Sequence, residues 1–258
     1  MTLAIICRKH GLLFIQAPRT GCTAIARLLM DRFQGEQLPA EDILDDNGHI
    51  VVPKKHCTVP QLLSQGLIPA NYRASLLTFT SVRNPYDSLV SLYVKKSNKY
   101  VAYLADHTSW VYRIPGYVED MEFCRTHSFS EWLDKHYPVT WLDRLLKRGQ
   151  RSLYGRYTNG VDKVMKFENL QNDFESVMRA AGVSGDVTIP RINETRARKS
   201  SSHQEYYSKA ARRTVDYVFK PDLDAYGYSF DRLHSSDPIG NIEASKTELA
   251  TNRHGHQS

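Results

Sequence analysis

The chain lacks the features that mark several classes of protein. No apolar stretch approaches the roughly 20 residues that a membrane-spanning helix requires, and the apolar residues 1–7 follow no basic segment, which argues against a signal peptide. The four cysteines contain no C-x-x-C pair and are too sparse for a disulfide framework. None of the ten histidines belongs to a convincing metal-ligand cluster. We therefore expect a cytoplasmic protein with reduced thiols, without a membrane span and without a metal.

The composition is that of an ordinary globular protein. Hydrophobic residues make up 41% of the 258 positions and charged residues 24%, and this length is sufficient for one α/β domain with a full core. The net charge of +6 predicts a weak attraction for anionic ligands. An excess this small argues little for nucleic-acid binding, so no nucleic-acid partner is expected.

Strands and helices alternate in two parts of the sequence. In residues 1–93 we expect a hairpin of strands 1–8 and 12–16, helices at 24–33 and 59–65, strands at 49–52 and 75–82, and a helix that begins after Asn84. Residues 162–167 and 168–181 repeat the order of strand and helix. This pattern predicts one α/β domain over residues 1–234, with a central, mainly parallel sheet flanked by helices, in a layout related to nucleotide kinases.

Residues 94–160 differ from the rest, because they are rich in tyrosine and tryptophan and poor in long apolar runs. Ser128 and Thr140 are candidate N-caps of two short helices. We expect this aromatic-rich helical insertion to lie over the sheet, with Trp110, Trp132 and Trp141 as packing residues. A polar basic stretch at 189–203 and a helix at 204–219 follow, and residues 235–258 are predicted to be disordered.

A short turn with anion-binding character joins the strand at 12–16 to the helix at 24–33. It reads Ala17-Pro18-Arg19-Thr20-Gly21-Cys22-Thr23. Backbone N–H groups and hydroxyls at a helix N-terminus favour a phosphate. The glycine-lysine-serine/threonine ending of the nucleoside-triphosphatase loop is missing. The turn therefore favours a phosphorylated nucleotide that is bound without a metal-assisted γ-phosphate.

A second candidate site follows the strand at 75–82. Arg83 stands at the end of this strand and Ser91 lies eight positions later, in the helix. Ligands of open parallel sheets bind beyond the carboxyl ends of the strands. An arginine at this place can grip a phosphate with two hydrogen bonds, and Ser91 can add a hydroxyl.

These two segments resemble motifs of the sulfotransferases that use 3′-phosphoadenosine 5′-phosphosulfate. Residues 17–23 look like the loop that binds the 5′-phosphosulfate, and residues 82–93 look like the motif that binds the 3′-phosphate. Residues 166–170 and 222–230 are similar to segments of the carbohydrate-type branch and its bacterial relatives. The resemblance extends over residues 10–232 in the same order.

The resemblance implies a role for each matching residue. Arg19 falls where many members have a lysine at the phosphate–sulfate bridge, and Thr20, Gly21, Cys22 and Thr23 would hold the 5′-phosphate. Arg83 and Ser91 would hold the 3′-phosphate. The basic residues of 193–200 resemble a segment that closes over the nucleotide, and the candidates for contact with phosphate are Arg196, Arg198 and Lys199.

His56 is the preferred general base, because it lies between the two nucleotide motifs and imidazole titrates near neutral pH. Its neighbour Cys57 is not expected to form a Cys–His dyad, since adjacent side chains usually point apart. The expected acceptor is a hydroxyl, first of all of a glycan. Small phenols, lipids, tyrosyl peptides and secondary metabolites stay open.

Two other functions compete with sulfuryl transfer. The first is a nucleotide or small-molecule kinase on a degenerate phosphate loop, which would need magnesium-dependent turnover of ATP. The second is a basic domain that binds sulfated glycans or nucleic acid without turnover. Affinity for a 3′-phosphorylated nucleotide would separate both from a sulfotransferase.

Overall fold

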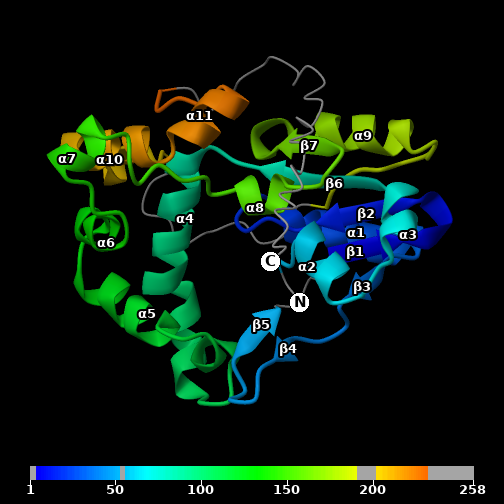
Figure 1. Cartoon of the computed structure of the whole chain (residues 1–258), viewed down its shortest axis with the longest axis horizontal. Helices are drawn as coiled ribbons and strands as arrows, with labels where there is room; N and C mark the ends of the chain where they lie inside the picture. Colours follow the sequence, from blue (N-terminus) through cyan, green and yellow to red (C-terminus); the bar gives the residue numbers. More distant parts are fainter. Residues whose placement is uncertain (1–3, 53–55, 191–201, 232–258) are drawn as a thin grey trace, which may run out of the picture.

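A five-stranded sheet forms the centre of the computed structural model, which describes residues 4–52, 56–190 and 202–231 (Figure 1). Strand β1 is antiparallel to both of its neighbours, whereas β2, β6 and β7 are mutually parallel. Four strands therefore run in one direction, and the predicted α/β domain with a mainly parallel sheet is confirmed. The strands in spatial order are β3 (Glu36–Leu38), β1 (Ala4–Cys7), β2 (Leu12–Ile15), β6 (Leu77–Val82) and β7 (Lys163–Lys166).

The N-terminal hairpin forms as predicted, with Cys7 opposite Leu12. A single 3-10 turn, η1 (Arg8–His10), joins its strands, and Gly11 follows with a φ of +60°. Strand β3 lies in the polar stretch for which no strand was expected. It has one neighbour in the sheet and its side chains are mostly exposed, so it carries no apolar signal. A separate small hairpin contains β4 (Ile43–Leu44), also unexpected, and β5 (Ile50–Val52), the predicted short strand.

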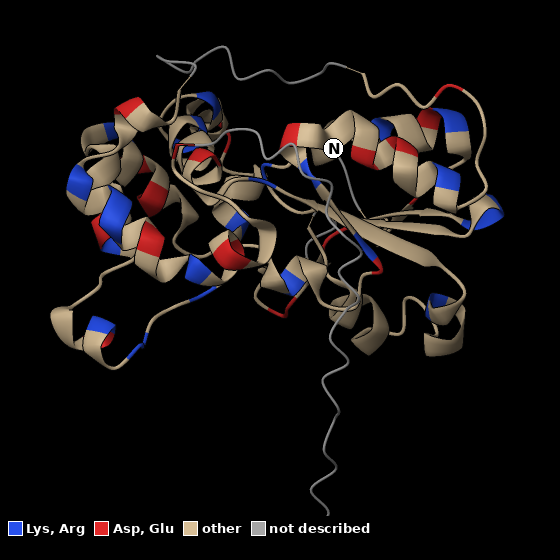
Figure 2. Cartoon of the chain, turned by 90° about the horizontal axis from the view of Figure 1, so that it is seen from above, with Lys and Arg blue, Asp and Glu red and all other residues tan. Residues whose placement is uncertain are grey.

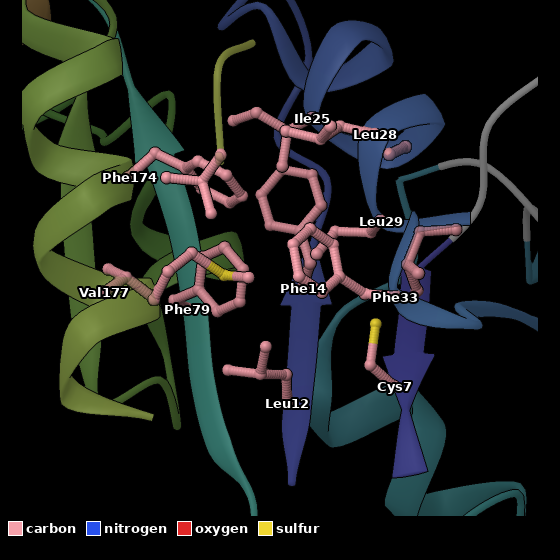
Figure 3. Packing of buried hydrophobic residues seen from close by; sticks show 14 of the residues in the cluster. Cys7, Leu12, Phe14, Ile25, Leu28, Leu29, Phe33, Phe79, Phe174 and Val177 are labelled. Carbon is pink, nitrogen blue, oxygen red and sulfur yellow. The ribbon is translucent and has the colours of Figure 1, made fainter. Parts of the chain in front are cut away.

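Helices cover both faces of the sheet. Helices α1 (Cys22–Phe33) and α9 (Leu170–Ala180) pack on one face, where the rings of Phe14 and Phe79 stack at 5.0 Å (Figure 3). The strand alternation sends Leu13 and Ile15 to the other face. That face is covered by α2 (Val59–Ser64) and α8 (Gly155–Thr158), with the short α3 (Ala70–Ala74) beside them.

The insertion builds a helical half beside the sheet. Figures 1 and 2 show its helices before α8 next to the sheet and not on its face, so the expected placement over the sheet holds for α8 and is wrong for the rest of the insertion. They pack on α4 (Pro85–Ser97) and α10 (Lys209–Val218) and share a separate core with them. The helices of the insertion before α8 are η2 (Lys99–Ala105), η3 (Trp110–Arg113), α5 (Tyr117–Thr126), α6 (Phe129–His136) and α7 (Trp141–Leu145).

The predicted caps Ser128 and Thr140 both form capping boxes, at the starts of α6 and α7. Trp132 is buried as expected, whereas Trp141 is 75% exposed, so its prediction as a packing residue is wrong. The expected helix at 204–219 is interrupted: η5 (Gln204–Tyr206) precedes α10, and α11 (Lys220–Tyr226) follows it. No helix within the described ranges is long and apolar enough to cross a membrane.

Candidate functional site

The turn between β2 and α1 has the backbone of an anion site. Arg19 and Gly21 both adopt left-handed backbone conformations, with φ of +68° and +75°. Gly21 is the N-cap of α1, and no side chain caps this helix. A Cβ on Gly21 would approach Leu170 Cδ2 to 2.8 Å and the Phe167 ring to 3.2 Å, so these side chains would have to shift, and the positive φ also favours glycine. The turn presents the positive end of the α1 dipole to a ligand.

The Arg19 guanidinium is incompletely satisfied. Its Nη2 donates to the Tyr100 hydroxyl at 2.7 Å, and the Tyr100 ring lies 5.8 Å from its carbon. Its Nε and Nη1 are buried and have no hydrogen-bond partner in the described part of the chain. Unpaired donors of a buried cation are costly. An anion at the turn would satisfy them.

Thr20 strengthens the turn with its side chain. Its buried hydroxyl donates to the Ala17 carbonyl at 2.9 Å and accepts from the Ser81 hydroxyl at 2.7 Å. That hydroxyl therefore connects the turn to the end of β6, and the backbone N–H is what Thr20 offers to a ligand. Cys22 and Thr23 stand in the first turn of α1, the former buried and the latter partly exposed.

Arg83, at the end of β6, joins the two turns. Its Nη1 donates to the Arg19 carbonyl at 2.9 Å, and its Nε donates to Asp87 at 2.7 Å in a buried ion pair that Nη2 also forms. The guanidinium lies 4.2 Å from the centre of the Phe167 ring. The positions of Arg19 and Arg83 are therefore coupled, as a site for a ligand with two phosphates would require.

Ser91 lies in α4, two turns after Arg83. It is 6% exposed and lies on the buried side of this helix. No described contact links Ser91 to Arg83. Its placement on the helix that begins at the Arg83 turn is compatible with a shared ligand.

His56 reaches the same end of β2 from another loop. Its Nδ1 lies 2.7 Å from the Gln16 carbonyl oxygen, three residues before Arg19. A carbonyl only accepts, so Nδ1 carries the proton and Nε2 is the basic nitrogen of the neutral ring. The neighbouring Cys57 is fully buried, and burial raises the pKa of its thiol to about 11. Cys57 is thus a protonated core residue, and the expectation of no Cys–His dyad agrees with this geometry.

Three residues at the site had no predicted role. The side-chain amide of Gln16 is fully buried, and neither of its polar atoms has a partner among the described residues. Its signal in the sequence is a polar residue at the end of an otherwise apolar strand. Tyr100 reaches Arg19 from the insertion, and this contact between distant segments has no sequence signal.

Glu168 is the third of these residues, and it connects the turn after β6 to the end of the described chain. Its carboxylate accepts from the Asn84 N–H and from the Tyr228 hydroxyl, both at 2.8 Å. Burial raises the pKa of Glu168, although these two hydrogen bonds and the nearby Arg83 oppose the rise. The similarity of residues 166–170 and 222–230 to known motifs therefore corresponds to a structural contact.

Arg196, Arg198 and Lys199 lie outside the described residues, as does the segment 235–258. In the described ranges, no group of three or more histidine, cysteine, aspartate or glutamate side chains could hold a metal ion.

Comparison with known proteins gives one finding. A model of the sulfotransferase family matches residues 3–229, which include both strand-end turns, the insertion and the Tyr228 contact. No curated protein and no solved structure matches significantly. The match extends over most of the chain, and it supports an enzyme that transfers a sulfuryl group. The chain belongs to the sulfotransferase family.

Proposed function

We propose that this protein transfers a sulfuryl group from 3′-phosphoadenosine 5′-phosphosulfate to a hydroxyl of a carbohydrate. The observation that carries the proposal is the partly buried Arg19 guanidinium, whose buried Nε and Nη1 have no partner among the described residues and which lies beside the uncapped N-terminus of α1. This arrangement is costly without an anion and becomes favourable with a phosphosulfate.

In the proposed reaction, His56 Nε2 accepts the proton of the acceptor hydroxyl, and the acceptor oxygen attacks sulfur in line. The bond between sulfur and the bridging oxygen breaks, and adenosine 3′,5′-bisphosphate leaves. Arg19 and the N–H groups of Thr20, Gly21, Cys22 and Thr23 stabilise the charge that develops on the leaving phosphate. The chemistry requires no metal.

The 3′-phosphate is assigned to Arg83 and Ser91. Arg83 has five N–H donors and uses three nitrogens for Asp87 and Arg19, which leaves N–H groups for a ligand. The buried Ser91 hydroxyl is the second donor. We assign Arg196, Arg198 and Lys199 to the segment that closes over the nucleotide, on the resemblance alone.

The proposed acceptor follows from the surroundings of Arg19. Tyr100 contacts Tyr103 and Trp110 with ring centres 6.1 and 5.4 Å apart, and Tyr103 is 42% exposed. Aromatic faces with polar edges suit a sugar ring. All four cysteines are free thiols, which supports a reducing compartment such as the cytoplasm.

Calorimetric titration tests the donor site. We expect the wild type to bind adenosine 3′,5′-bisphosphate more tightly than 5′-AMP or ATP. Ser91→Ala should weaken binding of the bisphosphate by about tenfold or more, the value of a hydrogen bond to a charged group, and leave 5′-AMP binding unchanged. Ser130→Ala, a partly exposed helix serine on α6, is the control. Equal binding of the bisphosphate and 5′-AMP by the wild type would contradict the proposal.

A further inference from the structure

Helix α7 has the reverse of the usual amphipathic orientation. Its apolar side chains stand at positions i, i+1, i+4 and i+5, which places them on one side of the helix. Among the described residues, they form the most exposed group of large apolar side chains. The exposed fractions on this apolar face are 75% for Trp141, 46% for Leu142, 67% for Leu145 and 46% for Leu146.

The opposite side of α7 contacts the protein, through backbone carbonyls and the Arg144 side chain. The Tyr217 hydroxyl on α10 lies 2.5 and 2.6 Å from the carbonyl oxygens of Asp143 and Arg148. The Arg144 guanidinium lies 4.9 Å from the centre of the Tyr217 ring. The orientation of α7 is therefore fixed by specific contacts, and its apolar face is held outward without further ordering on binding.

Exposed basic residues lie on α7 and on the segments that adjoin it. The one acidic side chain of α7, Asp143, is engaged in its capping box with Thr140. Lys and Arg recur along the helices of this half of the molecule in Figure 2, together with acidic positions. The exposed cations at α7 and on the adjoining segments are Arg144, Lys147, Arg148, Arg151 and Arg213.

We infer that α7 docks this protein on an anionic lipid bilayer. A tryptophan and leucines near exposed cations are the chemistry by which a helix inserts one face at the boundary of headgroups and acyl chains. Four apolar side chains are few for a stable contact with a second copy, since protein interfaces use about 20–30 residues a side. The inference is independent of the proposed donor site, and it would bring the enzyme to acceptors at a membrane surface.

Flotation of the full chain with vesicles tests the inference. We expect binding to vesicles of phosphatidylcholine with about one-third phosphatidylserine, weaker binding in high salt, and little binding to phosphatidylcholine alone. Leu145→Ser, and separately Lys147→Glu with Arg148→Glu, should each weaken binding by about tenfold or more. The matched controls are Leu63→Ser, an exposed leucine on α2, and Arg179→Glu, an exposed cation on α9.

Tryptophan fluorescence gives an independent readout. Anionic vesicles should shift the emission of the wild type to shorter wavelength. Trp141→Phe should remove the shift, because Trp132 is buried and Trp110 packs among Tyr100, Tyr103 and Tyr117 away from α7. Absence of vesicle binding by the wild type would overturn the inference. Equal losses of vesicle binding in the control variants would also overturn it. A dimer in solution that Leu145→Ser dissociates would do the same, because the apolar face would then bind a second copy. Titration of Leu145→Ser with adenosine 3′,5′-bisphosphate should match the wild type, which separates this test from the donor site.

Discussion

Two arginines follow neighbouring parallel strands of the same sheet, and their surroundings differ. After β6, Arg83 is paired with Asp87, donates to a carbonyl and lies against Phe167. After β2, the Arg19 side chain has one hydrogen bond, to Tyr100, and two buried donors without a partner in the described chain. The Arg83 guanidinium is therefore held in place by protein partners and still keeps N–H groups for a ligand, whereas Arg19 has buried donors that no described residue satisfies. The comparison separates an arginine that is fixed before a ligand binds from one that is poised for an anion.

The largest effect on folding is expected at Arg83. Arg83→Met deprives the buried Asp87 carboxylate of its cation, which should lower the free energy of unfolding by about 3–5 kcal/mol. Urea denaturation measures this change. The double variant with Asp87→Asn should recover part of the loss, and a double variant as unstable as the single one would show that the ion pair is not the cause.

Arg19 should behave in the opposite way. Arg19→Met removes a cation whose donors are unpaired, so the free energy of unfolding should not fall. The rate of sulfuryl transfer should fall by about 10²–10³, as for the loss of one donor to a developing charge. Single-turnover kinetics and urea denaturation of the same preparation give both values. If Arg19→Met were less stable than the wild type and still active, Arg19 would be a structural residue and not a ligand of the developing charge.

Gly21 allows the turn itself to be tested. Gly21→Ala combines an unfavourable φ with a clash against Leu170, and should lower the free energy of unfolding by about 1–3 kcal/mol. Gly116→Ala is a matched control, because Gly116 is also a helix N-cap with a φ of +72° but has nothing within 4 Å of the added Cβ. Thermal unfolding should show a smaller loss in the control. Equal losses would mean that the contact with α9 contributes nothing.

The smallest effect is a dependence on pH. The pKa of Glu168 is raised on folding from an ordinary value of 4.5, so the folded state binds this proton more tightly than the unfolded state. The stability that the proton provides is lost as pH rises from about 4.5 through the folded pKa. Glu168→Gln should flatten this part of the curve of unfolding free energy against pH. An unchanged slope between wild type and variant would show that burial of Glu168 has no net cost.

The sequence predicts the sheet half of the molecule better than the insertion. Strand periodicity, Gly21 and the cap at Asn84 are local signals, and they correctly locate the hairpin, α1 and the turn after β6. Strand β3 was missed because an exposed edge strand needs no apolar pattern. Trp141 was misjudged because aromatic residues are usually buried, and its exposure depends on the attachment of α7 to Tyr217 in a distant helix.

In the candidate site too, local sequence signals predicted some residues, whereas contacts between distant segments were missed. Arg19, Arg83 and His56 follow from motif and position, and the structure brings Arg19 and Arg83 into contact and places His56 at Gln16. The assignment of His56 as the base, and of each phosphate to its ligands, stays a prediction. The contacts of Glu168 and Tyr100 join segments more than 50 residues apart, and no local pattern in one sequence encodes such a contact.

The contact between Glu168 and Tyr228 also sets when the site can form during synthesis. Tyr228 donates to Glu168, and the Ser229 carbonyl accepts from the Asn84 side chain at 2.9 Å. A nascent chain that has emerged only through α9 has all the strands and both arginines, but the turn of Arg83 still lacks these two contacts. Because they come from residues near the end of the described chain, the turn is completed late, after nearly the whole domain has left the ribosome. The turn of Arg83 is therefore expected to take its final form later in synthesis than the turn of Arg19, whose contacts with Ser81, Arg83 and Tyr100 all lie before α9.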